Sequence, residues 1–199
     1  FHKENSRLAN YLAANGYVVA SVDFPLSGRE TLAEIPQLLD IANQPGDVSS
    51  VIDHVLSLNS KSGNALYGKV SPDSIGAMGL SLGGLTTALV SYHPDYKDSR
   101  IRAAVMMAPP LETFSDRFYA TNGELSSLTI SGSFDRVVPE QSNAIEVMPR
   151  NRNGWFLSFE KGTHLGFADV GDFLRWTENP DNLGCALMAR VLDKQELPD

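Results

Sequence analysis

The stretch Gly79-Leu80-Ser81-Leu82-Gly83-Gly84 decides the fold, because it joins an apolar run to a segment with helical spacing. The apolar run extends over residues 75–80, and apolar residues recur at the helical interval after the glycines. A strand, a tight turn and a helix in this order hold a serine in a strained conformation with its hydroxyl exposed. Residues two before and two after the serine must be small, because their side chains would collide across the turn. Both are glycine, so the stretch predicts a nucleophile at Ser81.

The same stretch permits two other interpretations. A glycine-rich turn between a strand and a helix can carry a serine that is only structural. Loops that bind phosphate through their backbone are also rich in glycine, but they end in Gly-Lys-Ser or Gly-Lys-Thr, which this chain lacks. The choice between a structural and a catalytic serine therefore depends on whether the rest of the chain provides a base and an acid.

The composition is that of a globular chain with an acidic surface. The 199 residues, 42% hydrophobic and 20% charged, suffice for one domain with a sizeable core. A net charge of -8 argues against nucleic acid and anionic membranes as partners. No apolar run is long enough to span a bilayer. The single cysteine, Cys185, has no partner for an internal disulfide.

Metal binding is not expected from this sequence. Metal sites draw on several histidine, cysteine or carboxylate side chains at regular spacing. No two of the four histidines show such paired spacing. We expect neither a metal nor an organic cofactor.

Apolar strands alternate with helices along the chain, without a repeat or a linker, so we expect one domain over residues 1–199. This alternation predicts a three-layer α/β/α arrangement around a mostly parallel sheet. The carboxyl ends of its strands then share one edge, where such sheets bind ligands. The expected strands are 17–24, 75–80, 101–108, 125–131 and 155–160. The expected helices are 6–15, 47–59 with Asp47 as N-cap, one after Ser81, a short one opened by Pro139, and 183–192.

Two loops after the later strands provide a base and an acid for Ser81. A serine hydroxyl is a weak nucleophile near neutral pH and needs an adjacent base, usually a histidine. Asp135 lies in the loop 132–139, and His164 lies in the loop after the last strand. Glu112 and Asp116, which follow the 101–108 strand, are alternative positions for the acid.

The chain resembles the α/β-hydrolase superfamily over nearly its whole length. The order serine, aspartate, histidine is typical of that superfamily, and so are the strings Gly-x-x-Asp-x-x-Val-Pro (132–139) and Gly-Thr-His (162–164). The most similar group comprises dienelactone hydrolase-like and platelet-activating-factor acetylhydrolase-like esterases, including bacterial lipases and cutinase-like polyesterases. Dienelactone hydrolases themselves carry a cysteine nucleophile. Ser81 departs from that pattern, which favours an ester over a lactone.

The resemblance implies a role for each site residue. Ser81 attacks the acyl carbon and forms an acyl-enzyme, while His164 takes the serine proton, passes it to the leaving alkoxide and then activates water. Asp135 fixes the histidine tautomer. The backbone N–H of Leu82 is one donor to the oxyanion.

In this superfamily the second donor comes from a loop that would lie before Phe1. We therefore expect a domain incomplete at its N-terminus, with the missing strand between 17–24 and 75–79. We expect this chain alone to be inactive and its parent protein active.

The function expected from this resemblance is hydrolysis of a small-molecule or lipid-like carboxylic ester. A non-catalytic binding module and a serine peptidase or amidase of the same fold are the alternatives. The segment 109–123 is the candidate cap over the site. Apolar residues near the triad are expected to line an acyl pocket: Leu82, Pro109, Pro110, Leu111, Val137, Leu165 and Phe167.

Overall fold

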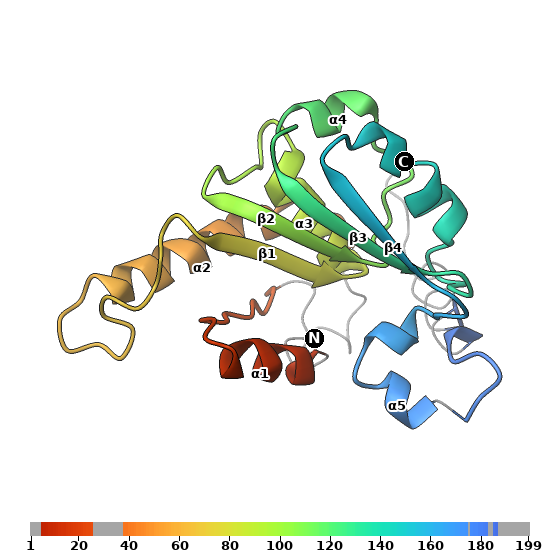
Figure 1. Ribbon diagram of the computed structural model, residues 1–199, viewed down its shortest axis with the longest axis horizontal. Helices are drawn as coiled ribbons and strands as arrows, with labels where there is room; N and C mark the ends of the chain where they lie inside the picture. Colours follow the sequence, from red (N-terminus) through yellow and green to blue (C-terminus); the bar gives the residue numbers. More distant parts are fainter. Residues whose placement is uncertain (1–4, 26–37, 175, 183–184, 187–199) are drawn as a thin grey trace.

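A four-stranded parallel sheet forms the centre of the computed structural model, which describes residues 5–25, 38–174, 176–182 and 185–186 (Figure 1). Its strands follow the order β1-β2-β3-β4. Helices flank the sheet, which confirms the α/β fold expected from the alternating pattern. The strands are β1 (Ile75–Leu80), β2 (Ile101–Met107), β3 (Ser126–Gly132) and β4 (Gly154–Phe159), each within about one residue of its predicted bounds.

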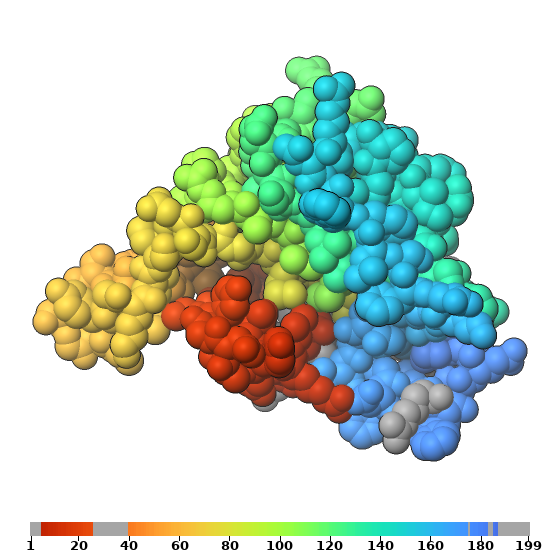
Figure 2. Space-filling view, in the orientation of Figure 1, coloured from red at the N-terminus to blue at the C-terminus, as the bar shows by residue number. Residues whose placement is uncertain are grey.

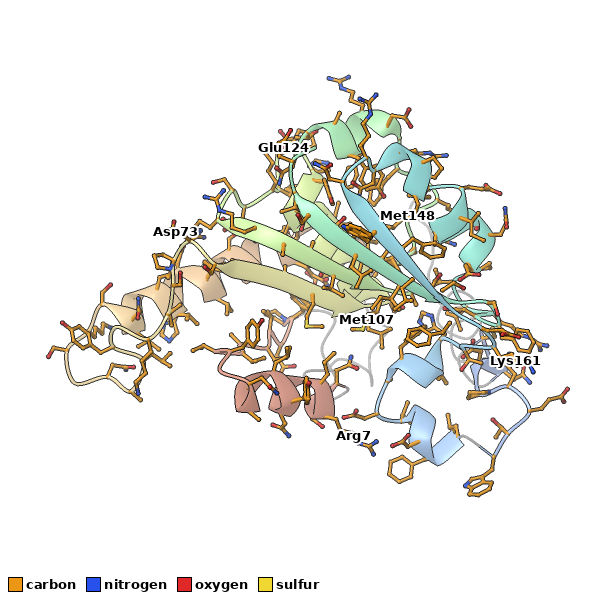
Figure 3. The ribbon with its side chains drawn as sticks, in the orientation of Figure 1. Arg7, Asp73, Met107, Glu124, Met148 and Lys161 are labelled. Carbon is orange, nitrogen blue, oxygen red and sulfur yellow. The ribbon has the colours of Figure 1, made fainter. Side chains whose placement is uncertain are left out.

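Pairing is parallel throughout, so the carboxyl ends of all four strands lie at one edge. Val105 of β2 pairs with Met78 of β1 and with Leu128 of β3. Figure 3 labels Met107 and Lys161, which end or follow a strand at this edge, and Asp73 and Glu124, which precede strands at the opposite edge. The loops that carry Ser81, Asp135 and His164 all leave the sheet at its carboxyl edge.

The main core lies between the sheet and α3 (Leu82–Tyr92), which packs across β1 and β2. Ala104 and Met106 point into this core and are almost completely buried. Tyr92 at the end of α3 meets the ring of Tyr119 in α4 (Asp116–Ala120), with the ring centroids 5.2 Å apart. Because α3 starts directly after Ser81, its burial fixes the position of the serine turn.

The helix α2 (Gln44–Asn59) begins three residues before the predicted N-cap. Asp47 lies in its first turn, and Asn43 occupies the N-cap position, so the predicted cap is wrong. Pro45 explains the difference, because a proline in the first turn gives up only an N–H that has no helical acceptor. A carboxylate in the first turn still interacts favourably with the helix dipole.

The remaining helices are short. α1 (Ser6–Ala14) is confirmed, and it ends before Gly16, whose φ is 89°. Figure 2 shows α1 beside the segment that carries α5, where Ser6 bonds Asp169 and Arg7 bonds Asp172. The short helix after Pro139 is present as η3. The other elements are η2 (Leu38–Ala42), η3 (Gln141–Ile145), η4 (Met148–Arg150), η5 (Leu165–Phe167) and α5 (Gly171–Leu174).

The predicted strand 17–24 is wrong, because these residues adopt no regular secondary structure. A strand exists only where a neighbour accepts and donates its backbone hydrogen bonds. Within the described sheet β1 is an edge strand, and residues 17–24 do not pair with it. Tyr17 is 65% exposed, and none of the four described strands pairs with residues 17–24.

The predicted helix 183–192 falls outside the described residues, apart from 185–186. Within the described ranges, every helix is too short or too polar to cross a membrane.

Candidate active site

Ser81 occupies a strained turn between β1 and α3. Its φ and ψ are 55° and -119°, a combination that L-residues rarely adopt. Backbone hydrogen bonds hold this conformation: the Ser81 N–H donates to the carbonyl of Met107 at 2.8 Å, and its carbonyl accepts from Leu85 N at 3.0 Å. The turn therefore has the strained backbone conformation predicted for it.

The glycines around Ser81 are needed for different reasons. A Cβ at Gly79 would overlap the carbonyl of Gly83, so the predicted collision across the turn holds at this position. A Cβ at Gly83 would meet no atom of the described residues within 4 Å, so the prediction that this position must also be small is wrong. The second tight position is Gly84, whose added Cβ would lie 3.0 Å from the Cβ of Pro109. The turn depends on Gly79 and on close packing of Gly84 against the loop after β2.

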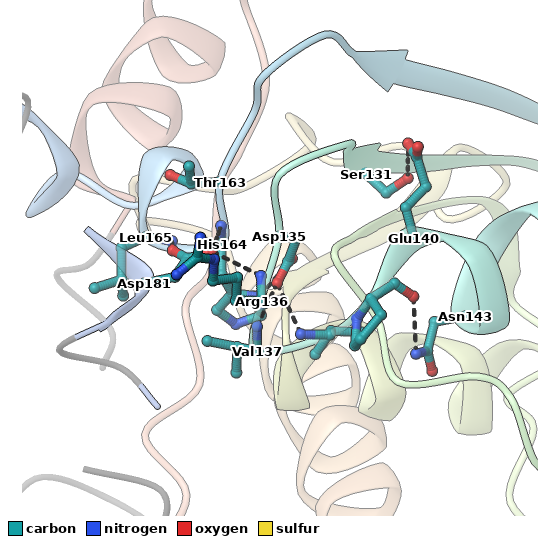
Figure 4. Close-up of polar contacts among 12 residues, drawn as sticks. Ser131, Asp135, Arg136, Val137, Glu140, Asn143, Thr163, His164, Leu165 and Asp181 are labelled. Carbon is teal, nitrogen blue, oxygen red and sulfur yellow. Dashed lines mark hydrogen bonds and ion pairs between the residues drawn. The ribbon is translucent and has the colours of Figure 1, made fainter. Parts of the chain in front are cut away.

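Asp135 and His164 form a buried pair at the same sheet edge (Figure 4). His164 Nδ1 lies 2.8 Å from Asp135 Oδ2. The other carboxylate oxygen accepts the N–H groups of Val137 at 2.9 Å and Val138 at 2.7 Å. The Asp135 side chain is fully buried, and that of His164 is 8% exposed. A carboxylate held in this way favours the tautomer with hydrogen on Nδ1, which leaves Nε2 available as a base.

The two loops of this pair are bound directly to each other. Phe134 N–H donates to the carbonyl of Gly162 at 2.9 Å, and Lys161 N–H donates to Ser133 Oγ at 2.9 Å. A Cβ on Gly132 would overlap the Gly162 carbonyl, so the close approach requires glycine there. The glycine in each loop string thus brings the backbones of the acid loop and the histidine loop together.

The alternative acids lie elsewhere. Asp116 is exposed and pairs with Arg150 at 3.8 Å. Glu112 is exposed, and its N–H donates to the side chain of Asn143. Neither bonds His164 in the described part of the chain, so the geometry favours Asp135 as the acid.

Ser81 is positioned separately from this pair. It follows β1, whereas His164 follows β4, at the other side of the same edge. Among the residues that the structure describes, no hydrogen bond joins the Ser81 hydroxyl to the imidazole of His164. Leu82 is the first residue of α3, so its N–H has no acceptor within the helix and is free to meet a developing negative charge.

The predicted acyl-pocket residues divide into two groups. Pro109 and Leu111 are almost completely buried, and Leu111 belongs to the core cluster with Phe118, so the structure puts both in the interior and not on a cavity wall. Val137, Leu165 and Phe167 are partly exposed near the pair, as are Leu82 and Pro110 after their strands. The reason for the difference is that the chain after β2 turns back under α3, as the contact between Gly84 and Pro109 shows.

Two cavities occur away from the predicted pocket. One of about 230 Å³ lies at the amino edge of the sheet, between Lys97, Arg102 and Glu124. The other lies beside Leu174, Asn179 and Asn182. In the described residues, no group of three histidine, cysteine or acidic side chains is arranged to hold a metal.

Asp181 is a site residue that the sequence analysis missed. Its buried carboxylate accepts backbone hydrogen bonds from both loops of the pair, including one from the N–H of His164 at 2.8 Å (Figure 4). The only local signal is an Asn-Pro-Asp turn, and the donors lie 16 to 45 positions away. No local sequence pattern therefore predicts that Asp181 belongs to the site.

The profile of the PET hydrolase-like family matches residues 6–196 of this sequence. The chain belongs to this family. The match covers nearly the whole chain and confirms the α/β-hydrolase superfamily. A search of functionally curated proteins found no match.

Several solved structures are similar to this PET hydrolase-like chain at low sequence identity. Thermogutta terrifontis esterase 2 phosphorylated by paraoxon has a TM-score of 0.57 and 19% identity, over 94% of this chain and 73% of that chain. A variant of Arabidopsis thaliana SOBER1 (TM-score 0.45, 17% identity) matches 62% of this chain. An alpha-beta serine hydrolase homologue from Coxiella burnetii (TM-score 0.46, 21% identity) matches 63% of it. The chain spans 56% and 52% of the lengths of these last two structures.

Proposed function

We propose that this protein hydrolyses carboxylic esters through an acyl-enzyme formed on Ser81. His164 acts as the base, and Asp135 orients it. The observation that carries the proposal is the buried hydrogen bond between Asp135 and His164, on the sheet edge where Ser81 occupies its strained turn. Membership of the PET hydrolase-like family supports the same chemistry, because that description names hydrolysis of a polyester.

The reaction has two steps, acylation and deacylation, and the same imidazole transfers protons in both. His164 removes the hydroxyl proton as Ser81 attacks the acyl carbon, and it returns this proton to the alkoxide that leaves. It then takes a proton from a water molecule, whose oxygen attacks the acyl carbon, and returns this proton to Ser81 Oγ as the bond between the serine and the acyl group breaks and the acid leaves. Asp135 stabilises the imidazolium in both steps, because its second oxygen is already held by two N–H groups and the carboxylate keeps its orientation.

The oxyanion of each tetrahedral intermediate requires hydrogen-bond donors. We assign one of them to the N–H of Leu82, at the positive end of α3. One such donor contributes roughly 3 kcal/mol to the transition state, or about a hundredfold in rate.

We propose a small-molecule or lipid-like ester as the substrate. The resemblance to dienelactone hydrolase-like and acetylhydrolase-like esterases supports this class. A serine nucleophile favours ester cleavage over lactone opening. Val137, Leu165 and Phe167 are partly exposed apolar side chains close to the pair in sequence, and we assign the acyl group to them.

Labelling with a fluorophosphonate tests the nucleophile. The full-length wild-type protein is expected to react covalently, and its variant Ser81→Ala is expected to lose the label. Ser126→Ala is the matched control, because Ser126 is an exposed serine at the amino end of β3, at the opposite edge. Absence of labelling in the wild type would favour the non-catalytic binding module.

Matched substrates separate an esterase from a peptidase or amidase. We expect p-nitrophenyl esters to be hydrolysed and the corresponding p-nitroanilides to remain almost intact. Comparable kcat/KM values for both would contradict the ester assignment and favour the amidase.

A further inference from the structure

Asp181 connects the two loops that carry the proposed base and its acid. Its side chain has no exposed surface. Oδ2 accepts the backbone N–H of His164 at 2.8 Å and that of Arg136 at 3.1 Å, while Oδ1 accepts the N–H of Leu165 at 2.9 Å (Figure 4). One carboxylate oxygen is therefore shared by the histidine loop and the acid loop.

These donors need such an acceptor. His164 is the N-cap of η5, and Leu165 is its first residue, so neither N–H has an acceptor within that helix. Burying an N–H without a partner costs about 1–3 kcal/mol, and a carboxylate can accept several bonds at once. The two oxygens of Asp181 satisfy both donors and fix the backbone from which the imidazole projects.

The segment around Asp181 is itself bound to the acid loop. Asn179 Oδ1 accepts the N–H of Asp181 at 2.8 Å, and Asn179 Nδ2 donates to the carbonyl of Phe134 at 3.2 Å. Arg136 Nη1 donates to Asn182 Oδ1 at 2.9 Å. We call residues 179–182 the bracket. It holds the neighbours of Asp135 on one side and the backbone of His164 on the other.

We propose that Asp181 is a positioning residue, which keeps the imidazole of His164 in hydrogen-bond contact with Asp135 by binding the backbones of both loops. The inference rests on the proposed function, since it deepens the assignment of the same site. Asp181 takes no part in proton transfer. Its effect follows from geometry, because a displacement of about 1 Å in a catalytic group can cost roughly a hundredfold in rate.

The test compares Asp181→Asn with Asp172→Asn, both made in the full-length protein. Asparagine keeps the shape but replaces one acceptor oxygen with an NH₂ group, which faces N–H donors. Asp172 is a matched control, because its half-exposed carboxylate bonds Arg7 and not the site. The measurements are the rate of fluorophosphonate labelling, kcat and KM for p-nitrophenyl butyrate, and the NMR signal of the His164 Nδ1 proton, all well below the unfolding temperature.

We expect Asp181→Asn to lower the labelling rate and kcat by about 10- to 100-fold, with KM changed by less than about twofold, and to weaken the Nδ1 proton signal through faster exchange. Asp172→Asn should match the wild type. A purely structural role would lower the unfolding temperature and leave kcat and the proton signal unchanged. That result would overturn the inference.

Two further measurements keep the outcome decisive. If the wild type itself fails to label, the proposed function is wrong, and the Nδ1 proton signals of the wild type and Asp181→Asn then decide the positioning role alone. If Asp181→Asn does not fold, hydrogen exchange of the backbone amides in the wild type decides whether the bracket holds the two loops. Protection of the amides of Arg136, His164 and Leu165 supports the bracket, and exchange as fast as in exposed loops contradicts it.

Discussion

At the scale of single residues, backbone clearance around Ser81 decides which substitutions the site tolerates. The strained φ of 55° persists because α3 begins immediately and packs against β1 and β2. Neighbouring glycines differ sharply in the space available to a side chain. This difference provides a test of the turn that does not depend on activity.

Gly79→Ala is expected to destabilise the protein, whereas Gly83→Ala is not. The new Cβ at position 79 would overlap the backbone of Gly83, which cannot move without displacing α3, and overpacking of this kind costs about 1–3 kcal/mol or more. At position 83 the Cβ points into open space, and alanine favours the helix by up to about 1 kcal/mol. Urea unfolding of both variants measures the difference. Equal stability would contradict the geometry of the turn.

Asp135→Asn is expected to abolish most of the activity without unfolding the protein. An amide at this position no longer selects the tautomer with hydrogen on Nδ1, and the loss in kcat is about 10⁴-fold when the tautomer is wrong. Glu112→Gln is the control, because Glu112 is the alternative acid and lies away from His164. Hydrolysis of p-nitrophenyl butyrate provides the readout. A larger loss in Glu112→Gln would move the acid to the loop after β2.

At the scale of elements, Arg100 connects α2 to the start of β2. Its guanidinium bonds both oxygens of Asp98, at 2.9 and 2.6 Å, and also reaches Asp53 of α2. The hydrogen bond from Arg100 is the largest of the effects that lower the pKa of Asp98 to about 2. Asp98 is nearly buried, so this pairing contributes to stability more than an exposed ion pair would.

The contribution of Asp98 has a defined pH window. Because the pKa falls on folding, the stabilisation is complete above about pH 4 and disappears as the pH drops toward 2. We expect the free energy of unfolding of Asp98→Asn to be about 1–2 kcal/mol below that of the wild type at pH 7 and to approach it near pH 2. Asp95→Asn, which changes an exposed neighbour, should show no loss at either pH. Urea unfolding at the two pH values provides the comparison, and a loss that persists at pH 2 would contradict the assignment.

The elements also show how far the sequence predicts this fold. The strand 75–80 follows from its apolar run, and it pairs with β2 and packs against α3. Residues 17–24 have a similar composition, but a strand depends on a pairing partner, which the local sequence does not reveal. The position of Leu111 after a strand predicts a pocket residue. Its burial instead depends on how α3 and α4 pack, which the local sequence does not reveal. The role of Asp181 depends on contacts between three loops that are far apart in the sequence, and no local sequence pattern predicts such contacts.

At the scale of the whole molecule, residues near the start of the described chain contact residues more than 160 positions later. Arg7 pairs with Asp172, and the Ser6 hydroxyl donates to Asp169 at 2.7 Å. Both Arg7 and Asp172 are at least half exposed. These contacts join α1 to the segment that follows the histidine loop, although both helices are short.

We expect Arg7→Ala to lower the free energy of unfolding by less than about 1 kcal/mol, because exposed ion pairs are weakened by solvent. The loss should also vanish in about 1 M salt, where the screening length falls to roughly 3 Å. Asp98→Asn should keep most of its effect at that salt concentration, since the Asp98 side chain is nearly buried. Urea unfolding at low and high salt measures both. The contradicting result would be a larger loss of unfolding free energy in Arg7→Ala than in Asp98→Asn, with that loss kept in salt. The contact between α1 and α5 would then hold the fold together, and the sheet with α3 would not be its main source of stability.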